Sequence, residues 1–399
     1  MDKKILFSAF AIFYTIFFMV PDLTHPIFGW INNLLVLSFV IVNIGMFKCT
    51  FLTQYKYINT CAIIWAIINI YTGYVNQDLF YDLTDWKGEI EESYSSMRFD
   101  HVIYYVIKFL SCILYYQFLS VSNKEHTFIR YFFFFMFMFA VVSDINAIIY
   151  QSESGSGYLV GNKFYVSYMN LFVVTLYYML HPEPNRTQKM KLKLLLLLSF
   201  LIALKTQCST VVIGTIILYY LIFAINDKLK GLLRNWKTYA LGLVVFDILF
   251  FFFTMAFIDN PIMRYIIVDI LGEDMTLTGR LDIYAALGPI IAETPLWGNG
   301  VGNATMITIM NGAGINAQNG LLNYLIEVGI FGVSAFFSML FFIMKNASKH
   351  KNTYPILCFI YMMLVLSSIE VTFKFYFFGM CFLLLLNNNA SIKNNTIRA

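Results

Sequence analysis

The sequence is poor in charged residues, which make up only 13% of its 399 positions. Soluble globular chains carry about 25% charged residues. Hydrophobic residues reach 59% here, and the mean hydropathy is +0.69. This composition excludes an ordinary soluble domain and predicts an integral membrane protein. The net charge of +4 does not indicate nucleic-acid binding, because the basic residues stand between apolar runs and form no continuous patch.

The sequence also lacks the patterns of disulfide, zinc and nucleotide sites. Its six cysteines lie within or beside apolar runs, and none forms a CxxC motif or a Cys/His cluster. We therefore interpret them as buried small apolar side chains. No acidic or histidine cluster has the spacing of metal ligands, so the sequence predicts neither a metal nor another cofactor. The apolar N-terminal run lacks a small-residue cleavage site, which favours an uncleaved first span.

What the sequence has in abundance is apolar runs of membrane-spanning length. A helix needs about 20 residues to cross the hydrocarbon core. We therefore expect an all-α, polytopic transmembrane helix bundle of about twelve spans. The spans are predicted near 5–21, 27–47, 57–75, 102–122, 129–149, 164–181, 193–206, 209–226, 239–259, 319–345, 354–370 and 373–387. Because 193–206 is short, it and 209–226 form either a tight hairpin or a broken helix.

Basic residues predict the orientation of these spans. They are concentrated in alternate connections, whereas the intervening connections are acidic or poor in Lys and Arg. The positive-inside rule then places both termini in the cytoplasm and the long connection 260–318 outside. The predicted organisation is spans one to nine in 1–259, an extracytoplasmic loop with short helices in 260–318, and three spans with a cytoplasmic tail in 319–399. Since ATP is absent outside, chemistry in the loop requires a substrate that is already activated or driven by a gradient.

The outer loop is predicted to contain a short helix that begins near Arg280, with Thr278 as a plausible N-cap. One apolar face is expected, formed by Leu281, Tyr284, Leu287 and Ile291. A guanidinium in the first turn, close to the positive helix end, suits a diphosphate. The alternative is an interfacial arginine that binds lipid headgroups or pairs with Asp274 or Asp282, and periodicity alone favours it.

Three glycines alternate at Gly298, Gly300 and Gly302. No strand precedes them, so a nucleotide-binding loop is not indicated. The pattern favours a tight turn around Asn299, and such a turn lets backbone approach a ligand closely.

A polar stripe follows at Asn319, Asn323 and Glu327, which share one face of the next predicted span. The two asparagines are equally compatible with packing between helices. The carboxyl is costly in a bilayer unless it is paired or protonated. Further polar groups within or beside predicted spans are Lys108, Asp144, Lys205, Gln207 and Asp247. Of these, Asp144 and Lys205 are expected to line an outward cavity.

Together these segments resemble the O-antigen ligase and polymerase superfamily. Its pattern is an Arg, a P-L-x-G-x-G turn, an H-N-x-x-L element and an E-x-G-x-x-G helix. The matching residues here are Arg280, Pro295–Gly300, Gln318–Tyr324 and Glu327–Gly332, and Lys205–Thr210 resembles the small polar element of that family before a span. The late position of one large outer loop is similar too. The small size, low charge and Asn-rich tail look like a Wzy-type polymerase of O-antigen or capsule repeat units.

The resemblance implies glycosyl transfer between undecaprenyl-diphosphate-linked oligosaccharides at the outer face of the bacterial plasma (inner) membrane. It implies catalytic roles for Arg280 as diphosphate clamp and for Gln318, Asn319 and Glu327. It implies substrate binding by Lys205, Arg264, Asn323, Gly298 and Gly300. Glu327 either orients one of these groups or is structural. The implied partners are the lipid-linked substrate, the bilayer, a chain-length regulator and a flippase.

One departure from the family pattern separates the alternatives. Gln318 stands where many relatives carry His, so a histidine base is missing here, which disfavours the ligase of the same superfamily. A flippase or transporter of lipid-linked oligosaccharide is a second alternative, which Lys108, Asp144 and Asp247 keep open. Internal repeats typical of transporters are not evident. A structural membrane scaffold is the third alternative, and the costly intramembrane charges disfavour it.

Overall fold

The computed structural model describes residues 2–18, 26–84, 88, 90–150, 156–243, 245, 280–314, 316–348, 351–368 and 370–387. Within these ranges the chain is mostly helical, which confirms the expected all-α class. Two short antiparallel hairpins are the exceptions. They are β1 (Phe80–Thr84) with β2 (Ile90–Ser95), and β3 (Ser156–Tyr158) with β4 (Gly161–Asn162).

The first half of the chain forms six α-helices with short 3-10 and π-helical extensions. They are α1 (Lys3–Ile12), continued by the π-helix η1 (Phe13–Phe17), α2 (Pro26–Val42), the 3-10 helices η2 (Ile44–Phe51) and η3 (Thr53–Tyr55), α3 (Lys56–Val75), α4 (Phe99–Ser122), α5 (Glu125–Ile149) and α6 (Lys163–Leu180).

The second half adds nine described α-helices. They are α7 (Arg186–Lys205), α8 (Ser209–Phe223), α9 (Asp227–Leu233), α10 (Trp236–Leu243), α13 (Arg280–Glu293), α14 (Ala304–Met310), α15 (Gly320–Ala347), α16 (Tyr354–Ser367) and α17 (Phe375–Leu383), with the 3-10 helices η6 (Lys351–Thr353) and η7 (Leu384–Asn387).

Several of these helices are long and apolar enough to span a membrane, as expected of a membrane protein. Among the described residues four qualify singly: Thr53–Val75, Phe99–Ser122, Glu125–Ile149 and Gly320–Ala347. Two bent pairs bring the number to six if each pair is one span. These are Gly29–Val42 with Ile44–Phe51, bent by 64°, and Ser209–Phe223 with Asp227–Leu233, bent by 117°. The expected number of twelve stays a prediction.

The segments 193–206 and 209–226, expected to form either a tight hairpin or a broken helix, form a hairpin. The helix that contains this segment begins earlier, at Arg186, because Asn185 and Gln188 form a capping box at its start. It packs directly against α8 after a three-residue turn over 206–208. The hairpin is therefore the correct alternative, and α7 is longer than the apolar run alone indicates.

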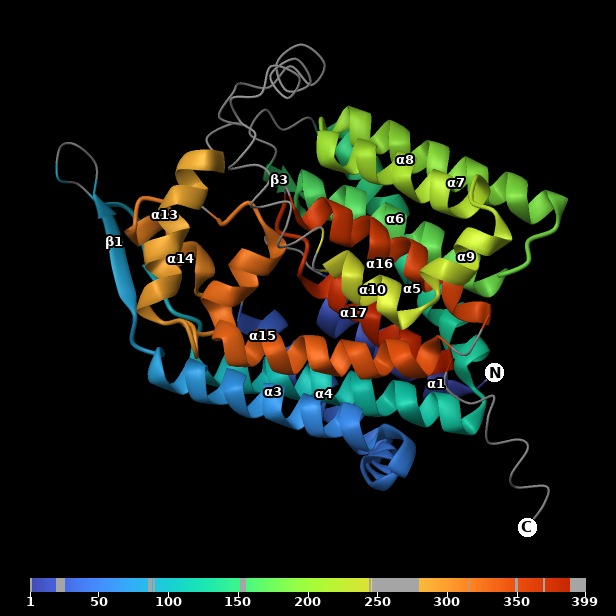
Figure 1. The fold of residues 1–399 in the computed structure, drawn as a ribbon, viewed down its shortest axis with the longest axis horizontal. Coiled ribbons are helices and arrows are strands. Elements are labelled where there is room, and N and C mark those ends of the chain that lie inside the picture. Colours follow the sequence, from blue (N-terminus) through green and yellow to red (C-terminus); the bar gives the residue numbers. More distant parts are fainter. Residues whose placement is uncertain are drawn as a thin grey trace.

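The core is built from aromatic and aliphatic side chains that tie distant helices together. Helices α3 and α15 lie side by side along the molecule (Figure 1). Between them the indole N–H of Trp65 donates a hydrogen bond to the hydroxyl of Tyr324 at 2.6 Å, in a fully buried position. Farther along, Phe17 packs against Phe132 and Phe172, which joins η1 to α5 and α6.

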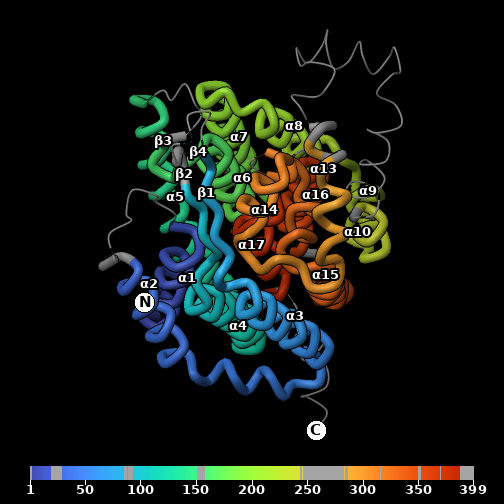
Figure 2. Tube along the Cα trace, turned by 90° about the vertical axis from the view of Figure 1, so that its left-hand side faces the viewer, coloured from blue at the N-terminus to red at the C-terminus, as the bar shows by residue number. Residues whose placement is uncertain are grey.

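One end of the bundle carries β1, α13 and α14, and we call it the loop end. It lies on the left in Figure 1, where β1, α13 and α14 stand beside the start of α15, and it faces the viewer in Figure 2. A small second core holds these elements together, with Leu287 and Ile290 of α13 packed among Met306 and Ile326. The expected apolar face of α13 is thus confirmed at Leu287, and Ile290 belongs to it as well.

Candidate functional site

Helix α15 is broken one third of the way along, at Gly329. This residue has φ 61° and ψ −175°, so the helix stops and restarts there. A break frees carbonyl groups on one side and N–H groups on the other, and in a membrane protein these groups need partners. The turn formed by residues 295–300 supplies them on both sides of the break.

The exchange consists of four backbone hydrogen bonds. The N–H groups of Asn299 and Gly300 donate to the carbonyls of Ile326 and Glu327, each at 2.8 Å. In return, the N–H groups of Ile330 and Phe331 donate to the carbonyls of Pro295 and Leu296 at 2.9 and 3.1 Å. The Pro295–Gly300 and Glu327–Gly332 motifs are therefore two halves of one structural unit.

Glycine is required where the two halves touch. A Cβ on Gly298 would lie 2.5 Å from the backbone nitrogen of Gly329 and 2.7 Å from the carbonyl of Glu327. Gly298, Gly300 and Gly302 also have positive φ angles of 75°, 92° and 83°, which confirms the expected tight turn. The space beside Gly298 is filled by protein backbone, so its small size has a structural explanation.

Two asparagines anchor the turn to neighbouring helices. The amide of Asn299 donates to the Thr294 hydroxyl at 3.0 Å and to the Ile326 carbonyl at 3.2 Å. The amide of Asn303 donates to the Asn299 carbonyl at 2.7 Å, and its oxygen accepts from the Met97 N–H at 2.9 Å. The turn is consequently fixed in place beside the start of α4.

Glu327 lies on the last turn of α15 before the break and is half-buried. Its carboxylate accepts a hydrogen bond from the backbone N–H of Gly302 and is attracted by the charge of Lys374. Its charge also acts on the hydroxyl groups of Tyr105 and Tyr324. The same turn that repairs the helix break therefore also holds the carboxylate of Glu327.

The start of α15 carries the predicted Gln318 and Asn319. Asn319 is the N-cap, and its side-chain oxygen accepts from the Leu322 N–H at 2.9 Å. Its side-chain nitrogen is buried without a hydrogen-bond partner. Gln318 is half-buried with φ 49°, and its N–H donates to the Asn316 side chain at 2.8 Å. Asn323 is buried one turn further along.

The turn between α16 and α17 meets this helix start. Gly320 packs against Ser367 and Phe373, at the two sides of that turn. The turn contains buried Glu370, whose carboxylate accepts from the Val371 N–H at 2.9 Å, and exposed Lys374. Non-helical backbone at membrane depth is tolerated where protein buries it, and Val371 and Phe373 are buried here.

Lys374 links this turn to polar residues at the starts of α6 and α8. Its ammonium donates to the Tyr165 hydroxyl at 3.3 Å, and its charge acts on both Glu327 and Glu370. Two residues before Tyr165, Lys163 donates to the Gln207 carbonyl at 3.1 Å. Exposed Lys205 ends α7 immediately before that turn.

These contacts bring four helix N-termini to the same end of the bundle. They belong to α6, α8, α15 and α17. Each N-terminus carries a partial positive charge, and Lys163, Lys205 and Lys374 add full charges. The loop end is therefore electrostatically suited to an anionic group, with the carboxylates of Glu327 and Glu370 beside it.

Arg280 is the first residue of α13, as the sequence predicts. Its helix packs against α14 and α15, which places the start of the Arg280 motif at the loop end with the other motifs (Figure 2). Arg264, Thr278 and Asp247 lie outside the described residues.

No family model matches the chain, and no curated protein matches it.

Of the three charged residues named with the transporter alternative, Lys108 and Asp144 are engaged by protein, and Asp247 lies outside the described residues. Asp144 accepts a hydrogen bond from the Asn170 amide at 2.7 Å. The Lys108 ammonium donates to the Thr15 carbonyl at 3.3 Å, in the π-helical extension of the first helix.

Sequence reasoning missed Lys163 and Lys374 as members of the site. The signal for Lys374 was the short polar interruption at 367–374, between two apolar runs. Such an interruption marks a turn between two helices, and here a lysine ends it. Lys163 follows Asn162, the N-cap of α6, so the pair marks a helix start. Neither signal shows from sequence alone that Lys163 reaches the start of α8, or that the charge of Lys374 acts on Glu327.

Proposed function

We propose that this protein is a membrane glycosyltransferase that polymerises oligosaccharide repeat units linked to undecaprenyl diphosphate. The product is an O-antigen, a capsule or another exopolysaccharide, made at the outer face of the bacterial plasma membrane. The observation that carries the proposal is the pairing of the Pro295–Gly300 turn with the broken helix at Glu327–Gly332. Two motifs of the superfamily, separated in sequence, serve one structure that holds a carboxylate at the loop end.

The proposed reaction is a displacement at an anomeric carbon. A hydroxyl of the acceptor sugar attacks the anomeric carbon of the donor chain, and a new C–O bond forms. The bond from that carbon to the diphosphate oxygen breaks, and undecaprenyl diphosphate leaves with the electron pair. The hydroxyl proton passes to a base. No nucleotide is needed, because the diphosphate is already a good leaving group.

The leaving diphosphate needs positive charge as the bond breaks. We assign Arg280 as the clamp, with Lys205 and Arg264 as further cations. Lys374 joins this set because its ammonium lies at the same end, beside the N-termini of α15 and α17.

The acceptor proton needs a base, and Gln318 cannot serve. We assign this role to Glu327, which is half-buried, held by the Gly302 N–H and attracted by the charge of Lys374. Asn319 and Asn323 are assigned to sugar or phosphate oxygens, and the unpartnered buried nitrogen of Asn319 supports a donor role.

The hydrogen bonding of two charged residues within the helix bundle favours the polymerase over a flippase. Lys108 and Asp144 are engaged with Thr15 and Asn170, within the part of the bundle that the structure describes. Charges that line a transport path would face water instead.

The deciding experiment is the glycan profile of a strain that lacks the protein. We expect single repeat units on the cell surface in place of a ladder of long chains, and restoration of the ladder by the wild-type gene. Accumulation of lipid-linked units on the cytoplasmic side would instead identify a flippase. Accumulation of long chains that are still linked to the carrier lipid would identify the ligase.

A further inference from the structure

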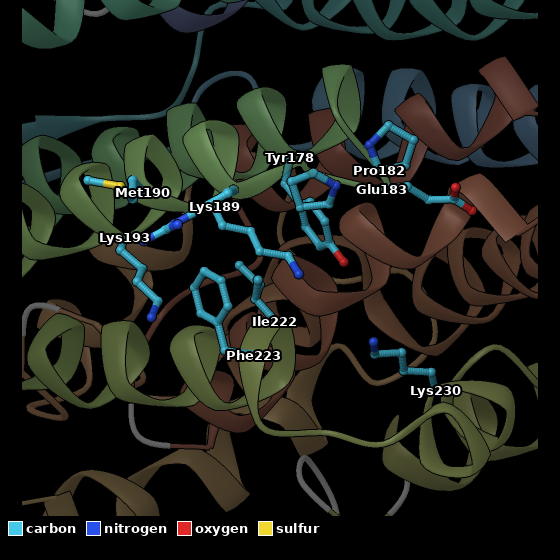
Figure 3. Close-up of a pocket in the computed structure, with 11 residues that line it drawn as sticks. Tyr178, Pro182, Glu183, Lys189, Met190, Lys193, Ile222, Phe223 and Lys230 are labelled. Carbon is cyan, nitrogen blue, oxygen red and sulfur yellow. The ribbon is translucent and has the colours of Figure 1, made fainter.

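A pocket of about 830 Å³ opens at the end of the bundle opposite to the loop end. It lies between the end of α6, the start of α7, the end of α8 and helix α9. Figure 3 shows Lys189 and Lys193 extending from α7 toward Ile222 and Phe223 of α8, with Lys230 on the other side. This pocket has no part in the proposed polymerisation.

The lining of this pocket is strongly basic. It includes Arg186, Lys189, Lys193 and Lys230 against a single acidic residue, Glu183. Lys230 lies 3.5 Å from the exposed carboxylate of Asp227. The structure records no ion pair for Arg186, Lys189 or Lys193 within the described residues. Lys193 lies over the ring of Phe223, 5.4 Å from its centre, so that a cation and an apolar surface are presented together.

The basic pocket continues into an apolar surface. Met190 lines the pocket and is 66% exposed, and it begins a stripe of exposed leucines along α7. The stripe comprises Leu194, Leu197, Leu198, Leu201 and Leu204. The exposed surface of a spanning helix is where acyl chains lie. Basic residues are concentrated in the first turns of α7, and apolar side chains follow them as far as Lys205 at the other end of the helix. This arrangement matches the two parts of a phospholipid.

We propose that this pocket binds the phosphate group of an anionic phospholipid, with the acyl chains against the exposed leucines of α7. The phosphodiester is held by Arg186, Lys189 and Lys193, and the positive N-terminal end of α7 adds to their attraction. A soluble phosphate would satisfy the cations alone, whereas the lipid also covers the leucine stripe. The continuity between pocket and stripe is what favours the lipid.

The test uses the full-length protein in nanodiscs with either phosphatidylcholine alone or added phosphatidylglycerol. We expect the anionic lipid to raise the wild-type melting temperature by about 2–5 °C, since a ligand that binds only the folded state stabilises it. The variant Arg186→Gln/Lys189→Gln/Lys193→Gln should lose this rise. It should also lose at least about tenfold in bound phosphatidylglycerol by native mass spectrometry.

The matched control is Lys48→Gln/Lys228→Gln/Lys345→Gln. It removes the same charge from exposed lysines outside the pocket and should keep the wild-type response. Both variants should melt like the wild type in phosphatidylcholine. Equal responses of the two variants would overturn the pocket as the site. A full effect of inorganic phosphate on the wild type would overturn the lipid as ligand.

Discussion

The backbone of Gly298 lies directly against the backbone of Gly329, with no room for a side chain on either residue. One glycine belongs to a turn before α14 and the other interrupts α15. Their contact permits the four hydrogen bonds that satisfy the broken helix. Since the same turn holds the carboxylate of Glu327, the stability of this contact and the position of the candidate site are linked.

Replacement of Gly298 by alanine should destabilise the protein. The new Cβ would overlap backbone that cannot move freely, and φ at this position is positive. Backbone strain of this kind costs about 1–3 kcal/mol, and overpacking adds a similar amount. The measurement is the melting temperature in detergent. Gly312→Ala is the matched control, because Gly312 also has positive φ but faces open space. Equal losses for the two variants would show that the clash is unimportant.

Arg280→Ala should abolish polymer while the protein inserts normally, because the diphosphate loses its clamp. Arg280→Lys should restore only part of the chain length, since an ammonium lacks the two parallel donors of a guanidinium. The readout is the glycan ladder, with membrane levels of the protein measured in parallel. Arg98→Ala is the control, because this exposed arginine pairs only with the adjacent Asp100 in the described structure. A normal ladder in Arg280→Ala would remove Arg280 from the mechanism.

Glu327→Gln should slow polymerisation by about 100-fold or more, the range of a lost general base. The amide keeps the size of the carboxyl and an oxygen for the Gly302 N–H, so the melting temperature should stay near that of the wild type. The rate is measured with purified enzyme and lipid-linked repeat units over a range of pH. Glu293→Gln serves as control, because Glu293 is an exposed carboxylate at the end of α13. An unchanged rate would make Glu327 a purely structural residue.

Lys374→Gln should raise the KM for the lipid-linked substrate by about tenfold, with a smaller effect on kcat. A hydrogen bond to a charged group contributes about 1.5–3 kcal/mol, and this ammonium lies beside two helix N-termini. Initial rates over a range of substrate concentrations separate the two constants. Lys345→Gln removes an exposed lysine at the end of α15 and should behave like the wild type. Matching KM values for the two variants would exclude Lys374 from substrate binding.

The stability of the protein is expected to fall slightly in acid because of an ion pair near the N-terminus, between Asp2 and Lys124. The hydrogen bond from the Lys124 ammonium, 2.9 Å long, lowers the pKa of Asp2 below its ordinary value of 3.8. A depressed folded-state pKa contributes stability above pH 3.8 and loses it as the pH falls through the folded value. The Asp2→Asn variant should therefore show a smaller loss of melting temperature on acidification than the wild type. The pair is exposed, so the difference should be small, and a larger loss in the variant would contradict this assignment.

Much of the local structure was predictable because it depends on local physics. The start of α13 at Arg280 and the turn at Gly298–Gly302 follow from residue types that favour those conformations. The cap at Asn319 was not predicted, although Asn is a favoured N-cap residue. The predicted site was less complete. Lys163 and Lys374 were missed, because a single lysine at a helix start looks the same whether it faces a site or a headgroup. Arg264 and Asp247 belong to the segment for which the sequence prediction stands alone.

The sequence by itself determined that this is a helical membrane protein, because the scarcity of charge and the length of the apolar runs leave no soluble alternative. It also indicated many of the helix ends, since glycines, caps and polar interruptions act within a few residues. The early start of α7 at Arg186 and the break of α15 at Gly329 were not among them. The tertiary structure decided which distant segments meet at those interruptions. Only the folded path brings residues 295–300 to the break at Gly329, because backbone hydrogen bonds between distant segments leave no pattern of side chains to read. The same holds for the attraction between Lys374 and Glu327 and for the basic pocket at the far end, because separate helices have to converge before their charges can act together.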